Sequence, residues 1–585
     1  MKKILIIFAV FLLLAVMVNA EQLNVKTIDY VKLKITQSGS LNINGIVEKA
    51  NLSYYVPQNG IQNIDVIGDG GMIWRYIFDS FNNKMVLLEW KKPTGMLNYR
   101  IEITVENRAK HMPVSTAIGT DDFYLKQTDS IRINDDIRQF AFPFEKSMKR
   151  AAELTAMVND YLTYDLSYVS RDLPSDQILK EKRGVCVQYA NLLAALLKAS
   201  DIPTRYVVGY AYSSVQEKFI GHTWVEILTD NGWVALDPTW LEAGYLDATH
   251  VENAYLMDNG QTDTLTYLGG DIDWTRTNDQ IEMLEYTQNS ITTIKVSGSG
   301  GIAPTDYGYV KAAVSSDECT LLDITANSCV DSNGVRQLDI QVPNRTLWLC
   351  EPQDVYWFFK PTGNNYICPV SVYDQMGGRS EYRVTVGGKS QQSPIFITGP
   401  ETVLVNELFT LTASTDGIFY STDFGLHAGT GWRLSIKKSG VYKFYLYAKN
   451  NLYEKTINVV QTKEFGLSAE APNTVNFNAP FYVNVTVKSL LGDATPLLTV
   501  KYTNQTVKQV VSLKSGEEKI FVFRLIANKE GPNDISISVT GNSLASQTLI
   551  VNTLQERKSG GVFGAIADFF SGIISAIMGL FGGKS

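Results

Sequence analysis

The sequence has no long block of basic residues and no pair of cysteines in a Cys-x-x-Cys spacing. Its 585 residues carry a formal net charge of −8, and no run of Lys and Arg is long enough to indicate a nucleic-acid partner. The missing Cys-x-x-Cys spacing argues against a zinc site. No acidic loop of the EF-hand type indicates calcium. We therefore expect no metal, no organic cofactor and no nucleic acid.

Cysteine itself is scarce, with five residues in the whole chain. Four of them, Cys319, Cys329, Cys350 and Cys368, lie within 50 residues of one another. An even cluster of this kind is typical of two disulfides in an exported protein. Sequential pairing (Cys319–Cys329 and Cys350–Cys368) is our expectation, although four cysteines allow three connectivities and reduced core cysteines are the alternative. Cys186 is the remaining thiol.

The two ends of the chain are the most apolar segments. Residues 1–20 combine Lys2 and Lys3, a long apolar run and a small-residue end at Ala20, which predicts a secretory signal peptide, with an uncleaved anchor as the alternative. Residues 562–581 are twenty largely apolar residues, the length of a bilayer-spanning helix. Asp568 and the small residues spaced along one side leave an amphipathic surface helix as the alternative. We expect a protein on the extracellular face of the membrane, held by this C-terminal segment (555–585).

Between these ends, alternating apolar and polar residues predict mostly β-structure. Hydrophobic residues make up 45% of the chain and aromatic residues 11%, so the protein is globular, and its length indicates several domains. We predict an N-terminal β-sandwich at 21–118, a catalytic domain at 119–290 and a cysteine-bearing β domain at 291–396. Two Ig-like β modules follow at 397–463 and 464–554, each marked by short alternating strands.

The stretch from Arg183 to Trp240 contains the residues that indicate chemistry. Gly184 permits a tight turn, and the following residues lack a helix breaker, so Cys186 is expected in the first turn of a helix. There the helix dipole and the free N–H groups favour a thiolate. The run His222-Thr-Trp-Val-Glu-Ile-Leu alternates, and Asp230-Asn231-Gly232 predicts a hairpin to the strand that ends at Asp237. A two-residue loop would bring Asp237 and His222 onto one face.

A thiol, an imidazole and a carboxylate form a complete nucleophile set, because the imidazole activates the thiol and the carboxylate orients the imidazole. The motifs Gly-x-Cys-x-x-Tyr, His-Thr-Trp-Val-Glu and Trp-Val-x-x-Asp-Pro-Thr, in this order, resemble those of the transglutaminase-like superfamily. The resemblance covers roughly residues 119–290. It implies an α+β papain-type core, here flanked by all-β sandwich domains, and catalytic roles for Cys186, His222 and Asp237.

Other residues of the predicted site are less defined. Trp224, Tyr164 and Tyr210 are our candidates for substrate binding, and Tyr164 also resembles the tyrosine that precedes the cysteine helix in this superfamily. The backbone N–H of Cys186 is one plausible oxyanion donor, and Tyr164, Tyr168 and Gln188 are candidates for the second. Asp247 and His250 form a second acid–histidine pair, to which we assign a structural role. We expect Glu226 to be solvated or at the edge of the cleft.

The function expected from these residues is that of a cell-surface cysteine enzyme acting on peptide or carboxamide bonds through a thioester. Water as the acceptor would make it a protease or amidase, and an amine would make it a protein-glutamine acyltransferase. We rank hydrolysis slightly ahead, because many microbial members of the superfamily are thought to be hydrolases. The alternative is a catalytically silent scaffold that binds peptides at the cell surface.

Overall fold

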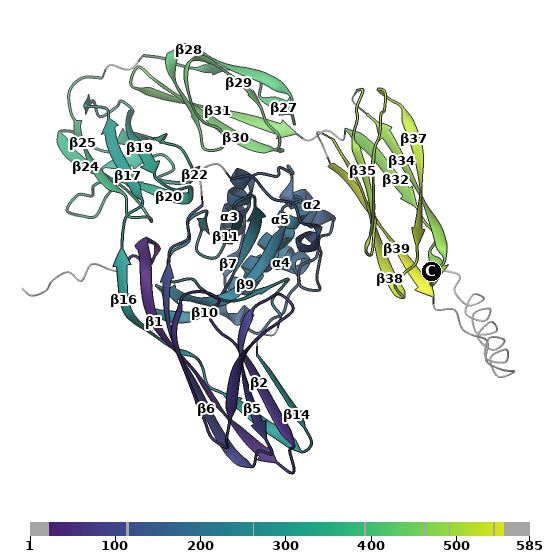
Figure 1. The fold of residues 1–585 in the computed structure, drawn as a ribbon. Helices are drawn as coiled ribbons and strands as arrows, with labels where there is room; N and C mark the ends of the chain where they lie inside the picture. Colours follow the sequence, from purple (N-terminus) through teal and green to yellow (C-terminus); the bar gives the residue numbers. More distant parts are fainter. Residues whose placement is uncertain are drawn as a thin grey trace, which may run out of the picture. The chain divides into compact units, whose positions relative to one another are not determined.

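A computed structural model describes residues 23–112, 116–260, 263–390, 393–460, 464–490, 492–541 and 544–554. The predicted signal peptide and the C-terminal hydrophobic segment lie outside these residues. Over the ranges described, no helix is both long and apolar enough to cross a membrane. The chain divides into two units, Met1–Val460 and Gln461–Ser585, and Figure 1 shows the order of their elements.

The N-terminal β-sandwich contains strands from two distant parts of the sequence. One sheet has the order β15-β1-β6-β3, with β16 also paired to β1, and the other has the order β14-β2-β5-β4. In Figure 1 the teal strand β16 lies beside the purple strand β1. Its strands are β1 (Ile28–Asn44), β2 (Lys49–Tyr55), β3 (Ile61–Gly68), β4 (Ile73–Phe78), β5 (Lys84–Lys91), β6 (Gly95–Arg108), β14 (Thr264–Leu268), β15 (Asp271–Arg276) and β16 (Gln280–Gln288).

This arrangement differs from the predicted domain boundaries. Residues 264–288 were expected inside the catalytic domain, but all three of their strands extend the sheets of the sandwich. The alternation of β1 explains the sandwich core, because Val31, Leu33 and Ile35 are fully buried while the residues between them are not. The chain thus leaves the sandwich after β6, forms the α+β core and returns to the sandwich.

The α+β core (residues 116–260) packs helices against a five-stranded sheet of order β12-β11-β10-β9-β13. The centre is helix α5, whose apolar residues are almost all buried. A separate parallel pair, β7 with β8, lies before α5. The elements are α2 (Asp135–Ala141), α3 (Met148–Tyr161), β7 (Thr163–Tyr164), α4 (Ser175–Glu181), β8 (Arg183–Gly184), α5 (Cys186–Ala199), β9 (Thr204–Ser213), β10 (Lys218–Thr229), β11 (Gly232–Asp237), β12 (Glu242–Ala243) and β13 (Val251–Leu256), with short 3-10 turns η2 (Asp122–Leu125) and η3 (Leu166–Tyr168). A further 3-10 turn, η1 (Val25–Thr27), lies outside this core and directly precedes β1.

The cysteine-bearing domain is a sandwich of sheets β17-β19-β23-β21 and β18-β25-β24-β20-β22. Its strands are β17 (Thr292–Gly298), β18 (Gly301–Ile302), β19 (Gly308–Ser316), β20 (Thr320–Asn327), β21 (Leu338–Ile340), β22 (Asn344–Leu349), β23 (Gln353–Pro361), β24 (Tyr366–Asp374) and β25 (Arg379–Val386). A core of apolar side chains between the two sheets includes Trp357 and Phe359, both fully buried.

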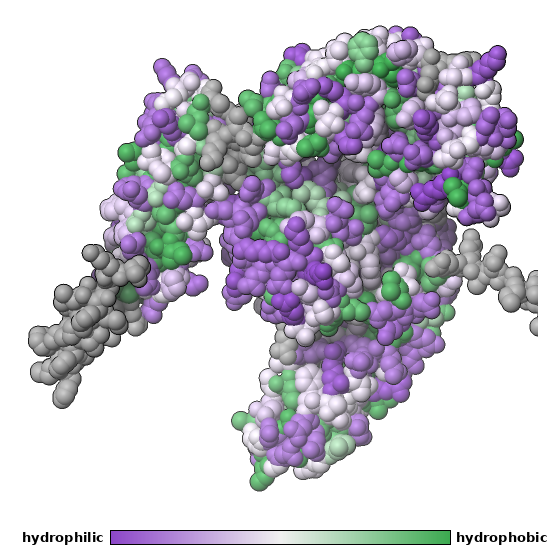
Figure 2. Space-filling model, turned by 180° about the vertical axis from the view of Figure 1, so that it is seen from behind, coloured by the Kyte–Doolittle hydropathy of each residue, from purple (hydrophilic) through white to green (hydrophobic). Residues whose placement is uncertain are grey.

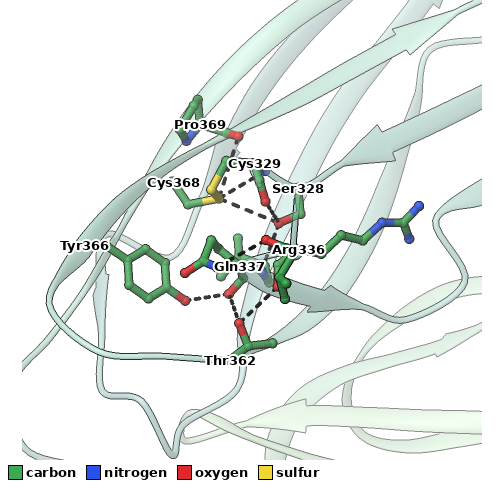
Figure 3. Close-up of a disulfide and its surroundings, with 10 residues drawn as sticks. Ser328, Cys329, Arg336, Gln337, Thr362, Tyr366, Cys368 and Pro369 are labelled. Atoms are coloured by element: carbon green, nitrogen blue, oxygen red, sulfur yellow. Dashed lines mark hydrogen bonds between the residues drawn. A yellow bond between two sulfur atoms is a disulfide. The ribbon is translucent and has the colours of Figure 1, made fainter. Parts of the chain in front are cut away.

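The predicted disulfide pairing is wrong, because the bonds are Cys319–Cys350 and Cys329–Cys368. Strands β20 and β22 pair with Thr320 opposite Leu349, so the residues one step beyond this pair, Cys319 and Cys350, face each other. Strand β24 lies on the other side of β20 and brings Cys368 to Cys329. Figure 3 shows this second disulfide, with Ser328 beside it. Strand pairing, rather than distance along the chain, selects the partners.

Two further β modules follow within the described residues. The first contains β26 (Ile397–Thr398), β27 (Thr402–Leu404), β28 (Leu408–Ser421), β29 (Gly425–Ser435), β30 (Gly440–Ala448) and β31 (Asn451–Val460). The second unit contains β32 (Phe465–Glu470), β33 (Thr474–Asn476), β34 (Pro480–Ser489), β35 (Leu497–Tyr502), β36 (Gln505–Val510), β37 (Glu518–Ile526), β38 (Gly531–Thr540) and β39 (Leu544–Leu554). On the face shown in Figure 2, hydrophobic residues form scattered patches among hydrophilic ones.

Candidate active site

Cys186 is the first residue of helix α5. The start of the helix is held by Gln188, whose Oε1 accepts a hydrogen bond from the Val185 N–H at 2.8 Å and whose Nε2 donates to the Arg171 carbonyl at 2.7 Å. Cys186 is the one free cysteine of the described chain and is partly exposed. The thiol thus lies at the positive end of a rigid, buried helix, where an anion is stabilised.

The hairpin of β10 and β11 brings the histidine and the aspartate together. Thr229 pairs with Gly232 across the two-residue loop, and the ladder runs to the pair Val225–Leu236. Only Gly232 of this turn has a positive φ, 105°, which is the glycine position expected after a type I turn. One step beyond the last pair, Asp237 falls opposite Trp224, on the same face as His222. The register predicted from the sequence is confirmed.

His222 hydrogen-bonds Asp237, with 2.8 Å between Nε2 and Oδ2. Because a carboxylate can only accept, Nε2 carries the proton in this bond. This leaves Nδ1 as the acceptor nitrogen of the neutral ring, and interactions with Cys186 are among the causes that raise the pKa of His222. Asp237 is held in turn by the Thr239 N–H, which donates to Oδ1 at 2.8 Å. Asp237 thus fixes the orientation of His222.

The charges of this pair are strongly coupled. Burial on its own lowers the pKa of His222, but the Asp237 carboxylate and Cys186 outweigh it and raise the pKa to about 9. Burial likewise opposes ionisation of Asp237, yet His222 and His250 hold the pKa of this carboxyl well below its usual range. His222 and Asp237 are almost completely buried, so the ion pair lies where water screens it little.

Aromatic rings surround the imidazole. Trp240 stacks on His222 with ring centroids 4.0 Å apart, and Trp224 lies 6.0 Å away. Trp224 is fully buried among Val207, Ala235 and Leu246. Trp224 packs beside the imidazole of His222. Because it has no exposed surface, it cannot touch substrate in this structure, contrary to the expectation that it binds substrate.

The three candidate oxyanion donors differ in whether their polar groups already have hydrogen-bond partners. Gln188 uses both ends of its amide at the start of α5, and the Tyr168 hydroxyl donates to Glu181 at 2.7 Å. Tyr164 lies in β7 opposite Gly184 and is 45% exposed. Burial raises its pKa to about 12, with further contributions from Cys186 and Asp237. Tyr164 is therefore the candidate that remains a hydroxyl donor beside the thiol.

Tyr210 and Glu226 lie elsewhere than the sequence suggested. Tyr210 lines a cavity of about 460 Å³ between the α+β core and the sandwich, and its hydroxyl donates to Asp279. Glu226 was expected in solvent or at the edge of the cleft, but it is buried and pairs with Arg205 and Lys110. That expectation is wrong, because the two cations compensate the cost of burying its carboxylate and hold its pKa low despite burial.

Sequence reasoning missed two contacts of the site. Trp240 follows directly on the Asp237-Pro-Thr motif, and this position was the signal that could have indicated its stacking. His250 reaches Asp237 Oδ2 at 3.2 Å, a contact that no local pattern predicts.

Imidazole and carboxylate atoms come within 4.8 Å of one another in two overlapping sets, His222–Asp237–His250 and Glu242–Asp247–His250. A metal ion needs several free donor atoms of this kind. The first set is hydrogen-bonded internally, and in the second Glu242 forms an ion pair with Lys26 at 3.8 Å. The contacts of the first set are those of an ion-pair network, whereas Glu242 Oε1, Asp247 Oδ2 and His250 Nδ1 of the second set have no hydrogen-bond partner among the described residues.

Comparison with known proteins identifies the core. A family profile described as the transglutaminase-like superfamily matches residues 138–238, which include Cys186, His222 and Asp237. This segment is a transglutaminase-like core. It accounts for α3, α5 and the β9–β11 sheet strands, and the flanking sandwiches lie outside the match.

Two curated proteins are similar to parts of this chain. A protein-glutamine gamma-glutamyltransferase of Pseudomonas aeruginosa is 31% identical over 98 residues, which are 14% of this chain and 15% of the relative. An uncharacterised Bacillus subtilis protein is 24% identical over 162 residues, 24% of this chain and 21% of the relative. The chain thus spans a small part of each relative. A solved structure described as a putative cysteine protease from Cytophaga hutchinsonii is 17% identical, covers 45% of this chain and 93% of its own, and has a TM-score of 0.35.

Proposed function

We propose that this chain is a cysteine enzyme that cleaves peptide or carboxamide bonds through a thioester on Cys186. The observation that supports this most is the position of His222, which is hydrogen-bonded to the buried Asp237 through Nε2 and whose pKa is raised in part by Cys186. A histidine fixed in this tautomer can take a proton from a thiol and return it to a leaving group.

The first half of the reaction forms the thioester. His222 Nδ1 takes the Cys186 proton, and the thiolate attacks the substrate carbonyl carbon. The tetrahedral intermediate collapses when the C–N bond breaks and the imidazolium gives its proton to the departing amine. Asp237 holds the Nε2–H throughout and stabilises the imidazolium.

In the second half, water attacks the thioester while His222 takes one of its protons. The C–S bond then breaks, the product leaves as a carboxylic acid, and the thiolate–imidazolium pair is restored. An amine in place of water would give an amide, which is acyl transfer. The name of the Pseudomonas aeruginosa relative favours acyl transfer. Hydrolysis needs only water as the acceptor and no binding site for an amine.

The oxyanion of both intermediates requires donors near Cys186. We assign this role to the Cys186 backbone N–H, at the start of α5, and to the Tyr164 hydroxyl. The exposed apolar side chains of Tyr164, Leu166 and Val169 lie on the segment that precedes the thiol. We propose that these exposed side chains contact a hydrophobic side chain of the peptide near the scissile bond.

Thiol alkylation tests the proposal. The chain without residues 1–20 is reacted with iodoacetamide between pH 4 and pH 10, and the label is mapped by mass spectrometry. Fast alkylation of Cys186 near neutral pH, slowed about 10²-fold in His222→Ala, supports an activated pair. Alkylation no faster than that of a free thiol, unchanged in His222→Ala, would refute the enzyme and leave a peptide-binding scaffold.

The acceptor is then decided with casein and a fluorescent primary amine. Incorporation of the amine into casein indicates acyl transfer, and new carboxyl termini without incorporation indicate hydrolysis. Cys186→Ala is the blank for both readouts.

We further propose that the protein acts outside the cytoplasm, with a C-terminal membrane attachment. Two disulfides in one domain support an oxidising compartment. Cleavage of the protein on intact cells by an added protease is the expected result, and protection until the cells are lysed would contradict the location.

A further inference from the structure

The carboxylate of Asp237 is shared by two imidazoles. His222 Nε2 and His250 Nε2 reach the same oxygen, Oδ2, at 2.8 Å and 3.2 Å. The rings of the two histidines have centroids 5.7 Å apart, and both side chains are almost completely buried. A triad alone requires one imidazole on this carboxylate, so the second one needs an explanation.

A second carboxylate faces His250 from its other side. Its Nδ1 forms an ion pair with Asp247 Oδ2 at 3.4 Å, and Asp247 is fixed by two hydrogen bonds from Thr249 to Oδ1. Burial lowers the pKa of His250, but Asp247 and Asp237 together raise it well above its ordinary value. A carboxylate within 3.4 Å of each ring nitrogen favours the doubly protonated, positively charged form of His250.

The remaining charged groups around His250 come from two other elements. Glu242 in β12 pairs across the ladder with Asp237, and burial together with Asp247 raises the pKa of this carboxyl to about 8. Lys26 in η1 forms an ion pair with Glu242 at 3.8 Å and donates to the Trp240 carbonyl. The Tyr245 phenol also lies near this network, and Asp247 and Glu242 add to the burial that raises its pKa.

The N-terminal sandwich fixes the backbone at His250. The side-chain amide of Asn107 in β6 donates to the carbonyls of Ala248 and His250, both at 2.8 Å. Lys26 also comes from the start of the sandwich. The sandwich therefore holds the second imidazole in contact with the candidate active site.

We propose that His250 is a positioning residue whose positive charge, applied through Asp237, lowers the proton affinity of His222 and holds the carboxylate in line. This proposal rests on the function proposed for Cys186, His222 and Asp237. A buried imidazole beside a carboxylate alone binds its proton too tightly to act as a base near neutral pH. A second cation on the same oxygen weakens that hold, because like charges oppose protonation.

The test removes the positive charge of residue 250 and keeps a hydrogen-bond donor there. His250→Gln retains an N–H group near Asp237 but is neutral. The chain has four histidines, so ¹⁵N-histidine spectra can be assigned with His111→Gln and His427→Gln. We expect the pKa of His222 to rise by about one unit in His250→Gln, and the pH dependence of Cys186 alkylation to move upward with it. Trp224→Phe, which alters packing beside both rings without changing charge, is the matched control and should leave the pKa of His222 in place.

An unchanged pKa of His222 in a folded His250→Gln protein would overturn the proposal, since a purely structural residue changes rates or stability without moving this value. If His250→Gln does not fold, the wild-type spectra decide. A His250 ring protonated at both nitrogens at pH 8 supports the proposal, and a neutral ring overturns it. Both readouts are independent of thiol activation, so an inert Cys186 would refute the enzyme while the effect of His250 on His222 is still measured.

Discussion

The imidazole of His222 and the indole of Trp240 lie face to face, with ring centroids 4.0 Å apart and planes inclined by 13°. Trp240 therefore covers one face of the His222 ring, and Asp237 accepts a hydrogen bond from Nε2 at the ring edge. Covering the ring keeps water from the hydrogen bond and strengthens it, because charges interact more strongly where water is excluded.

Removal of the Trp240 indole should lower the rate at which Cys186 is alkylated. In Trp240→Ala we expect alkylation of Cys186 to fall about tenfold at neutral pH, while Trp240→Phe, which keeps an aromatic face, should stay within about twofold of wild type. The measurement is the second-order rate constant with iodoacetamide. Equal rates in Trp240→Ala and wild type would show that the stack contributes packing only.

The Tyr164 hydroxyl should matter for turnover. Its pKa is raised to about 12, so it stays protonated and able to donate throughout pH 5–10. Tyr164→Phe should lower kcat about 10²-fold with a small change in KM. Tyr168→Phe is the matched control, since that hydroxyl is bonded to Glu181, and it should leave kcat close to wild type. Similar losses in both variants would exclude a specific role for Tyr164.

The stability of the α+β core should fall at alkaline pH. The folded-state pKa of His222 is raised from 6.5 to about 9, so its stabilising contribution is complete below pH 6.5 and is lost as the pH rises to about 9. The loss amounts to about 3 kcal/mol at most. Over the described residues all α-helices lie in this core, so circular dichroism at 222 nm follows its unfolding in urea.

His222→Gln isolates this contribution. The variant should be less stable than wild type at pH 6.5, and its own loss of stability between pH 6.5 and pH 9 should be smaller. Parallel losses in the two proteins would mean that the histidine is neutral in the folded state.

Peptide mapping without reduction should recover Cys319 linked to Cys350 and Cys329 linked to Cys368. Each bond closes a loop of 31 or 39 residues, so Cys319→Ser with Cys350→Ser should destabilise the cysteine-bearing domain by about 4 kcal/mol. Cys186→Ser serves as the control for removing a cysteine without opening a loop. Recovery of the sequential pairs would contradict the strand order of β20, β22 and β24.

The sequence by itself determined that Cys186 begins a helix and set the register that joins His222 to Asp237. Each of these depends on short-range features: a breaker-free helix after Gly184, an alternating strand at His222, and a two-residue turn whose length sets which side chains share a face. These local rules operate within a few residues, so they can be read before the chain is folded.

Only the tertiary structure decided how distant segments meet. It joined β14–β16 to the N-terminal sandwich, crossed the disulfides through the pairing of β20 with its neighbours, and buried Glu226 between Lys110 and Arg205. It also brought His250 to the carboxylate of Asp237. Such contacts depend on which sheets and loops pack together over long sequence distances, and no local periodicity encodes that choice.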